Sequence, residues 1–186
     1  MKPALLVIDI QNDYFPGGKM ELFGMELAAA NAGQLIDLFR KNNWPVIFIQ
    51  HLASNPRASF FIPETPGAEI HESVRPSENE KVIIKNYPNS FRNTELQAHL
   101  QPLQQTELVV CGAMSHMCVD TTVRAAFDLG YACTLISDAC ATRDLVFNDQ
   151  KVKAVNVQLA YMAALNGTFA EVITTRQFSS RIHNDQ

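Results

Sequence analysis

The sequence predicts a three-layer α/β/α sandwich built on a six-stranded, mainly parallel β-sheet. Short apolar runs alternate along the chain with longer amphipathic stretches, which is typical of a parallel sheet covered by helices on both faces. The chain has 186 residues, which is the size of one domain. Hydrophobic residues make up 47% of it, enough to bury a sizeable core and to exclude a disordered chain.

Six apolar runs predict the strands of the sheet. In chain order they are Ala4–Ile10, Val46–Gln50, Val82–Lys85, Leu108–Cys111, Ala132–Ser137 and Glu171–Thr174. Each run is short and largely apolar, as expected for strands that are buried on both faces. No internal repeat or low-complexity tract interrupts them.

Four longer stretches predict the helices, because their apolar residues recur near helical spacing. They are Met25–Lys41, Glu95–Leu100, Val119–Leu129 and Gln150–Leu165. Thr94 is a capping residue before the second of them, and Pro102 follows its end. Gly130 terminates the third helix and Asn166-Gly167 the fourth.

Two segments stand outside this alternation. Leu52–Glu80 is rich in proline and has no sustained period, and a loop of that length in a compact domain often serves as a lid or binding loop. The polar tail 179–186 is expected to fray. We therefore expect one domain over residues 1–178, followed by this tail.

Composition narrows the class of partner. The net charge is −4 and the basic residues are scattered, so neither a nucleic acid nor a membrane is an expected partner. The apolar runs are far shorter than the roughly 20 residues that span a bilayer. Charged residues make up only 18% of the chain, which suggests surface hidden in an oligomer.

The N-terminus and the cysteines predict a cytoplasmic protein. The apolar run after Lys2 stops at Asp9, which is too short for an export signal. We therefore expect the four cysteines to be reduced. These are Cys111, Cys118, Cys133 and Cys140. They have no zinc-ligand spacing, and His51 and His71 are expected to be ordinary polar residues, so no metal is predicted.

Three polar residues lie where the carboxyl ends of strands should meet, which is where open parallel sheets bind ligands. Asp9 ends a buried apolar run, and Lys85 closes another. Cys118 lies six residues beyond Gly112, near a helix start whose dipole can lower the pKa of the thiol. Each has a structural alternative: a capping acid, a solvated strand end and a core cysteine. Together they supply a base, a cation and a nucleophile.

Four blocks of sequence resemble the isochorismatase-like cysteine hydrolases. They are Ala4–Asp13, Val82–Lys85 with Ser90-Phe91, Val109–Val119 and Asp138–Ala141. They occur in order and cover most of the chain, up to about Phe178. This family includes nicotinamidases, carbamoyl-amide hydrolases and the isochorismatases. The resemblance implies a Rossmann-like strand order 3-2-1-4-5-6 and a homodimer or homotetramer.

The resemblance also implies the roles of individual residues. Asp9 becomes the general base, Lys85 the supporting cation and Cys118 the nucleophile, with no cofactor. A cis peptide between Ala113 and Met114 is implied, and it would direct the Met114 N–H, together with the Cys118 N–H, into an oxyanion hole. The implied reaction is acyl transfer to Cys118, followed by hydrolysis of a thioester.

Departures from the family pattern narrow the substrate. Nicotinamidases carry a metal site that starts with Asp-x-His, which Ile49–Ser54 lacks, so nicotinamide is not the expected substrate. The retained cysteine favours an amide or ester carbonyl. The expected pocket walls are apolar or aromatic, apart from one histidine: Phe15, Tyr87, Phe91, Met114 and His116. Phe15 and Phe91 have core packing as their alternative, and His116 has loop packing.

The sequence thus predicts a cysteine hydrolase that acts on small-molecule amides. Two alternatives stay open. One is an isochorismatase-type vinyl-ether hydrolase that uses Asp9 and Lys85 without Cys118. The other is a non-catalytic nucleotide-binding or interaction module. The absence of a Gly-x-Gly-x-x-Gly motif after the first strand argues against this second alternative.

Overall fold

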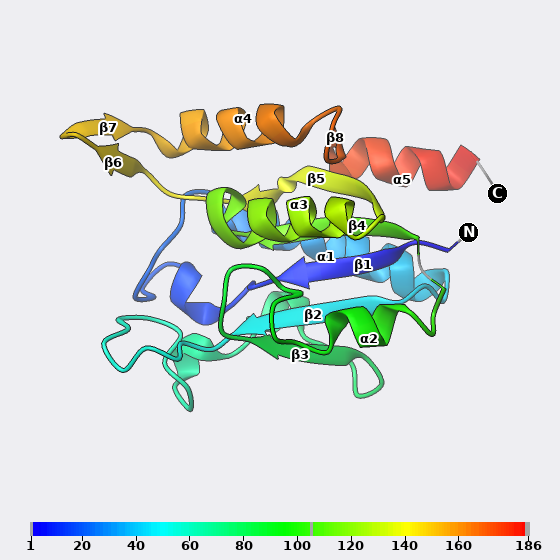
Figure 1. The fold of residues 1–186 in the computed structure, drawn as a ribbon, viewed down its shortest axis with the longest axis horizontal. Helices are drawn as coiled ribbons and strands as arrows, with labels where there is room; N and C mark the ends of the chain where they lie inside the picture. Colours follow the sequence, from blue (N-terminus) through cyan, green and yellow to red (C-terminus); the bar gives the residue numbers. More distant parts are fainter. Residues whose placement is uncertain (1, 105, 185–186) are drawn as a thin grey trace.

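The computed structural model describes residues 2–104 and 106–184, apart from the side chains of residues 183 and 184. Its central sheet has six parallel strands in the order β3-β2-β1-β4-β5-β8 (Figure 1). With β8 as the sixth strand of this sheet, the order is the one that the family resemblance implies. The predicted fold class is therefore confirmed.

The strand bounds follow the apolar runs closely. The strands of the main sheet are β1 (Ala4–Ile8), β2 (Val46–His51), β3 (Lys81–Lys85), β4 (Glu107–Ala113), β5 (Ala132–Ala141) and β8 (Glu171–Ile173). All five residues of β1 are buried, because this strand lies in the middle of the sheet and both of its faces are covered. β5 runs further than predicted, to Ala141, and a bulge between Val110 and Gly112 interrupts its pairing with β4.

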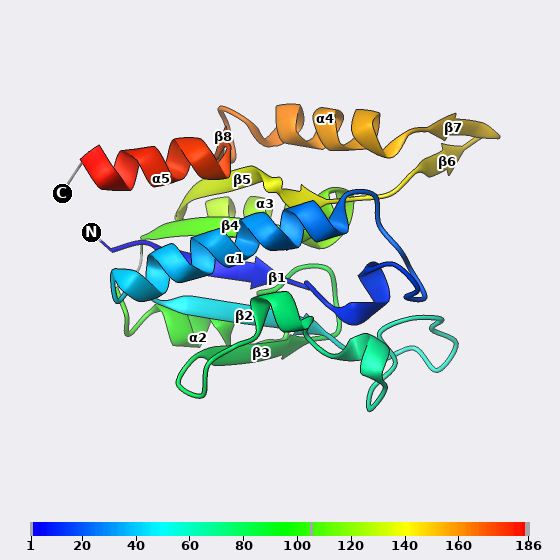
Figure 2. The same ribbon diagram turned by 180° about the vertical axis from the view of Figure 1, so that it is seen from behind.

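Helices cover both faces of the sheet and give the three layers. They are α1 (Met25–Lys41), α2 (Leu96–Leu100), α3 (Asp120–Asp128), α4 (Ala154–Leu165) and α5 (Thr175–Asn184). α1 and α5 lie on one face, in front in Figure 2, where their apolar side chains share a core with β1 and β2. Apolar residues of α2, α3 and α4 form the core on the opposite face. No helix in the described part of the chain is long and apolar enough to cross a membrane.

Two predicted elements are wrong. The helix expected from Gln150 begins at Ala154, because Gln150–Val152 forms strand β7 of an antiparallel hairpin with β6 (Leu145–Phe147). Asn148 and Asp149 turn this hairpin with positive φ angles of 49° and 59°, a conformation that these residue types tolerate.

The frayed tail expected from Ser179 is the second error. Residues 179–184 continue helix α5, and residues 185–186 lie outside the described residues. Phe178 anchors this helix, since its ring stacks against that of Phe39 on α1 with centroids 5.9 Å apart. Ile182 packs against the same core, so two apolar side chains hold a stretch whose composition is largely polar.

The segment Leu52–Glu80 is ordered by contacts with the loop after β1. It contains two short 3₁₀ turns, η2 (Pro66–Ala68) and η3 (Glu72–Val74), and buries the side chain of Phe61. Asp13 holds it in place, because its carboxylate accepts a hydrogen bond from the Phe61 N–H at 2.7 Å. Gly67 lies so close to Asp13 that a Cβ atom there would be 2.2 Å from Oδ1, so only glycine fits this contact.

Candidate active site

Three neighbouring strands end in polar residues at the carboxyl edge of the sheet. Asp9 follows β1, His51 ends β2 and Lys85 ends β3, with His51 and Lys85 in direct register. Parallel strands bring such residues to one edge, so the strand ends alone place a carboxylate, an imidazole and an ammonium beside one another.

The backbone at Asp9 leaves the extended conformation. Its φ is 51°, in the left-handed region that costs a non-glycine residue free energy, although aspartate tolerates it better than most. The Asp9 N–H still donates to the Ile49 carbonyl at 3.0 Å, so the chain turns without losing this bond to β2. The side chain of Asp9 is fully buried.

Gly112 allows β4 to bring the cysteine to the same place. Its φ is 122°, and a Cβ atom there would lie 2.0 Å from the carbonyl oxygen of Ile8, so no other residue fits. The chain then passes through a cis peptide bond between Ala113 and Met114. A π-helical turn, η4 (Ser115–Val119), follows and leads into α3. Cys118 lies in this turn, a rare conformation that is frequent at functional sites.

Lys85 is the centre of the cluster. Its Nζ atom lies 2.7 Å from Oδ2 of Asp9, 3.2 Å from Sγ of Cys118 and 2.8 Å from Nδ1 of His51. An ammonium carries three N–H donors and no acceptor, so these three acceptors match its full hydrogen-bonding capacity. The structure therefore brings together all three residues that the sequence predicted as a base, a cation and a nucleophile, and adds His51.

Asp9 keeps most of its accepting capacity. Apart from the ion pair with Lys85 and the contact with the Cys118 thiol, no partner within the described part of the chain reaches either carboxylate oxygen. Buried carboxylates normally have several partners, so such a group is unusual. One of its oxygens and the Cys118 sulfur lie within 4.8 Å of each other. The carboxylate is thus placed to accept a proton from the thiol.

The expectation that the pKa of Cys118 is lowered is wrong. Burial raises the pKa of this thiol strongly, and the negative charge of Asp9 raises it further, which outweighs the opposing effect of Lys85. Burial also works against the charge on Lys85, yet attraction to Asp9 and Cys118 leaves the pKa of this lysine above its ordinary value. The resting cluster is therefore a neutral thiol beside a carboxylate–ammonium pair.

Two further residues of the site, His51 and Tyr14, are not among those that the sequence predicts. His51 is expected to be an ordinary polar residue, although it closes an apolar strand just as Asp9 and Lys85 do, and that shared pattern is a signal that could identify it. Tyr14 is buried; burial and then the charges of Cys118 and Asp9 hold the pKa of its hydroxyl well above the usual range. Its ring packs against that of Phe61, with centroids 4.5 Å apart.

Three of the five predicted wall residues, Phe15, Met114 and Tyr87, lie on loops between the helices and strands. Phe15 stacks on His71 with ring centroids 3.5 Å apart, and Met114 lies at the start of η4, so both lie on loops that lead into or out of the cluster. Tyr87 lies under the guanidinium of Arg92 at 3.8 Å.

The other two wall residues make packing contacts. Phe91 stacks on Tyr131, which precedes β5, and packs against the core of that face, which favours a packing role. His116 lies 2.6 Å from the Thr142 hydroxyl through Nδ1. Burial, with a smaller effect of Arg143, lowers the pKa of His116, so its ring is neutral near pH 7.

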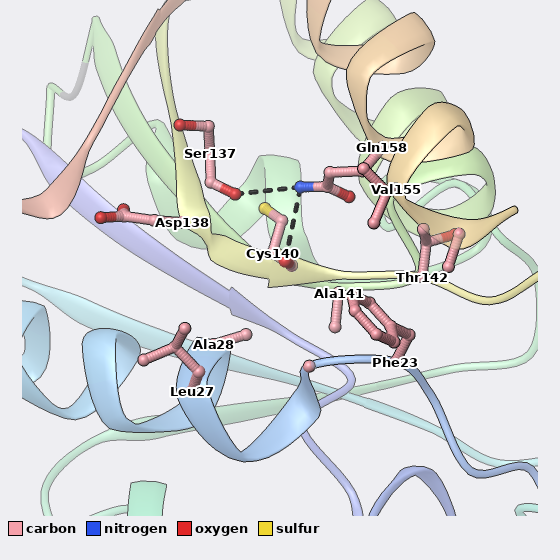
Figure 3. Close-up of a pocket in the computed structure, with 12 residues that line it drawn as sticks. Phe23, Leu27, Ala28, Ser137, Asp138, Cys140, Ala141, Thr142, Val155 and Gln158 are labelled. Carbon is pink, nitrogen blue, oxygen red and sulfur yellow. Dashed lines mark hydrogen bonds between the residues drawn. The ribbon is translucent and has the colours of Figure 1, made fainter.

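A separate pocket lies between α1, β5 and α4. Its volume is about 220 Å³, and Phe23, Leu27 and Val155 form part of its apolar lining (Figure 3). Figure 3 shows the Gln158 amide, which donates to the carbonyls of Ser137 at 2.9 Å and Cys140 at 3.4 Å. None of Asp9, Lys85 and Cys118 lines this pocket.

Comparison with known proteins identifies the family. Residues 3–177 match the isochorismatase domain model. A Bacillus subtilis protein, the uncharacterized isochorismatase family protein YddQ, is 56% identical over 178 residues, which cover 96% of this chain and 99% of the relative. The chain belongs to the isochorismatase family.

Solved structures agree with this assignment. The crystal structure of an isochorismatase from Pseudomonas putida KT2440 has a TM-score of 0.89 and 41% identity, covering 95% of this chain and 89% of that one. Nicotinamidase 3 of Arabidopsis thaliana is 29% identical over 170 residues, which cover 85% of this chain and 80% of the relative. The protein is thus an isochorismatase-family hydrolase.

Proposed function

We propose that this isochorismatase-family protein is a cysteine hydrolase of small-molecule amides, with Cys118 as nucleophile, Asp9 as general base and Lys85 as supporting cation. The observation that carries the proposal is the position of Lys85, whose ammonium touches both the carboxylate and the sulfur. A raised pKa in a free thiol means that the resting sulfur is protonated, so attack needs a base at hand. Asp9 is that base.

The reaction follows from these contacts. Asp9 takes the thiol proton as Cys118 Sγ bonds to the amide carbonyl carbon, which gives a tetrahedral oxyanion. We place this oxyanion at the N–H groups of Met114 and Cys118. The C–N bond breaks as Asp9 delivers the proton to the leaving nitrogen, leaving a thioester. Water then gives a proton to Asp9 and attacks the thioester, the C–S bond breaks, and the sulfur regains its proton.

Lys85 stays charged throughout the cycle. When Asp9 is ionised, the ammonium neutralises it. When Asp9 carries the proton, the same ammonium faces the developing thiolate, which lies 3.2 Å away in the resting state. Lys85 therefore pairs with the negative charge while the charge lies on the carboxylate or on the sulfur, and the two N–H groups stabilise it once it has moved to the oxyanion.

An amide is favoured over the other substrates by the presence and contacts of the cysteine. The name of one relative, Nicotinamidase 3 of Arabidopsis thaliana, supports an amide as the substrate class. A vinyl-ether hydrolase would use Asp9 and Lys85 and would not need Cys118. A nucleotide-binding module is disfavoured, because Asp9 places a negative charge at the strand end where a phosphate would approach.

The experiment is a hydrolysis screen against small primary amides, N-carbamoyl amides and aryl esters. Cys118→Ala is expected to lose activity by at least about a thousandfold. Cys133→Ala is the matched control, because Cys133 is a buried cysteine of β5 whose sulfur donates to the Tyr131 carbonyl at 3.8 Å, outside the cluster. If Cys118→Ala retains the rate, the amidase proposal fails; consumption of isochorismate by that variant would support the ether hydrolase.

We further propose that the protein is a cytoplasmic homodimer or homotetramer. All four cysteines are free thiols, which suits a reducing compartment. Large apolar side chains are exposed on the β6–β7 hairpin and α4, among them Phe147 at 76% and Leu159 at 68%. Sedimentation should show an oligomer that Phe147→Glu with Leu159→Glu dissociates; a wild-type monomer would contradict the proposal.

A further inference from the structure

His51 is the one member of the central cluster to which the proposed reaction gives no task. Its side chain is 20% exposed, whereas those of Asp9 and Lys85 are fully buried. Its Nδ1 lies 2.8 Å from Lys85 Nζ, and 3.9 Å from the nearer oxygen of Asp9. The contact with the lysine is thus a hydrogen bond, and the one with the aspartate is not.

The chemistry of the lysine determines the state of the histidine ring. An ammonium can only donate, so Nδ1 of His51 must be the acceptor. The ring is then neutral and carries its proton on Nε2. Burial and the positive charge of Lys85 both lower the pKa of His51, against the effect of Asp9, which agrees with a neutral ring.

The backbone of His51 is held rigidly by Gln11. The Gln11 side chain accepts from the His51 N–H at 2.8 Å and donates to the His51 carbonyl at 2.9 Å. The same amide also donates to the Ala68 carbonyl at 2.8 Å, so it has little freedom. The imidazole therefore projects from a fixed backbone position, and its ring lies beside that of Phe61, with centroids 5.9 Å apart.

We propose that His51 is a positioning residue that orients the Lys85 ammonium toward Cys118. The three N–H bonds of an ammonium point in tetrahedral directions, so fixing two of them fixes the third. Asp9 takes one and His51 takes another, which leaves the third directed at the cysteine sulfur, 3.2 Å away. Without the imidazole, Lys85 keeps its ion pair but loses its direction.

This inference rests on the proposed function, in which Lys85 faces a developing thiolate. Three substitutions of His51 form a matched set, because they differ in where the side chain carries a hydrogen-bond acceptor. The amide oxygen of asparagine lies as many bonds from Cα as His Nδ1, and that of glutamine as many as Nε2. His51→Asn therefore keeps the acceptor, His51→Gln moves it to the other ring nitrogen, and His51→Leu removes it.

The test measures alkylation of Cys118 by chloroacetamide as a function of pH, which needs no substrate. His51→Leu is expected to slow labelling at pH 8 at least tenfold and to move the profile to higher pH, while His51→Asn stays within about threefold of wild type. If His51→Leu labels like wild type, or if His51→Gln alone restores the rate, the proposal is overturned. With an amide substrate, kcat should fall in His51→Leu with little change in KM.

A second measurement does not depend on any variant folding. Nitrogen NMR of the wild-type histidines should show His51 with an unprotonated Nδ1 and a protonated Nε2 between pH 7 and 9. A protonated Nδ1 would overturn the proposal. Neither alkylation nor NMR uses Cys118 as a nucleophile toward substrate. An active Cys118→Ala variant would therefore reject the proposed function, while the role of His51 would still be decided by these two measurements.

Discussion

Replacing Lys85 by methionine tests the physical basis of the cluster. Methionine keeps an unbranched apolar chain of similar length in the site, so the main change is the loss of the ammonium. Asp9 is then buried with no cation, and among the described residues only the Cys118 thiol still contacts its carboxylate. Removing one partner of a buried ion pair costs about 3–5 kcal/mol of folding free energy, because the other charge is left without compensation.

The loss of stability should depend on pH with a definite sign. In wild type, Asp9 and Cys118 raise the pKa of Lys85 despite its burial, so the ammonium contributes fully at every pH below the ordinary lysine range. In Lys85→Met, the folded chain avoids a lone buried carboxylate by holding a proton that the unfolded chain releases. The free energy of unfolding then falls by about 1.4 kcal/mol for each pH unit, until the loss levels off at about 3–5 kcal/mol.

The assay is urea unfolding of wild type and variants at pH 5 and pH 8. Lys81→Met is the matched control on the same strand, because Lys81 pairs with Glu95 at an exposed site, and its loss should stay within about 1 kcal/mol. The double variant Asp9→Asn with Lys85→Met should regain most of the stability at pH 8. Equal losses for Lys85→Met at both pH values, or no recovery in the double variant, would refute the reasoning.

Three further outcomes follow from the geometry. Gly112→Ala should destabilise the fold by more than about 3 kcal/mol in urea unfolding, because its Cβ would overlap the Ile8 carbonyl and its φ is 122°; a near-neutral change would contradict the close approach of β1 and β4. Gly67→Ala should displace the Asp13 carboxylate and lower the free energy of unfolding by about 1.5–3 kcal/mol. The double variant Asp13→Ala with Gly67→Ala should be no less stable than Asp13→Ala alone, because the carboxylate that the new methyl group would displace is already gone. Additive losses of stability in the double variant would count against the contact. Lys85→Ala frees three ligands within 4.8 Å of one another, so this variant should bind Co²⁺ with a thiolate absorption band that Cys118→Ala removes; a colourless variant would argue against that spacing.

Strand ends made much of the site predictable from sequence. Asp9 and Lys85 each close an apolar run, and a parallel sheet brings such ends to one edge, so their convergence follows from the pattern of residues alone. The prediction of Cys118 also required the expected helix start after Gly112, because this cysteine does not end a strand. Their distances were not predictable, since they depend on the left-handed turn at Asp9 and on the π-helical turn at the cysteine.

Properties that depend on burial could not be predicted from sequence. The helix start at Cys118 suggests a lowered pKa, but the opposite shift results from burial and from Asp9, neither of which a linear pattern measures. The strand-end position of His51 is a sequence signal, but it gives no contact, and the register with Lys85 is what shows that the two side chains meet. The helical pattern also misplaces the start of the fourth predicted helix at Gln150. Asn148 and Asp149 form the turn of a hairpin there, and Gln150 begins its second strand, β7.

The central claim is that Cys118 carries the acyl group during hydrolysis. The most direct measurement is intact-protein mass after acid quench during turnover of p-nitrophenyl acetate, with peptide mapping of any adduct. We predict one acetyl group on Cys118 in wild type and in Cys133→Ala, and neither adduct nor turnover in Cys118→Ala. Turnover that continues in Cys118→Ala, with no adduct on the wild-type cysteine, would contradict it.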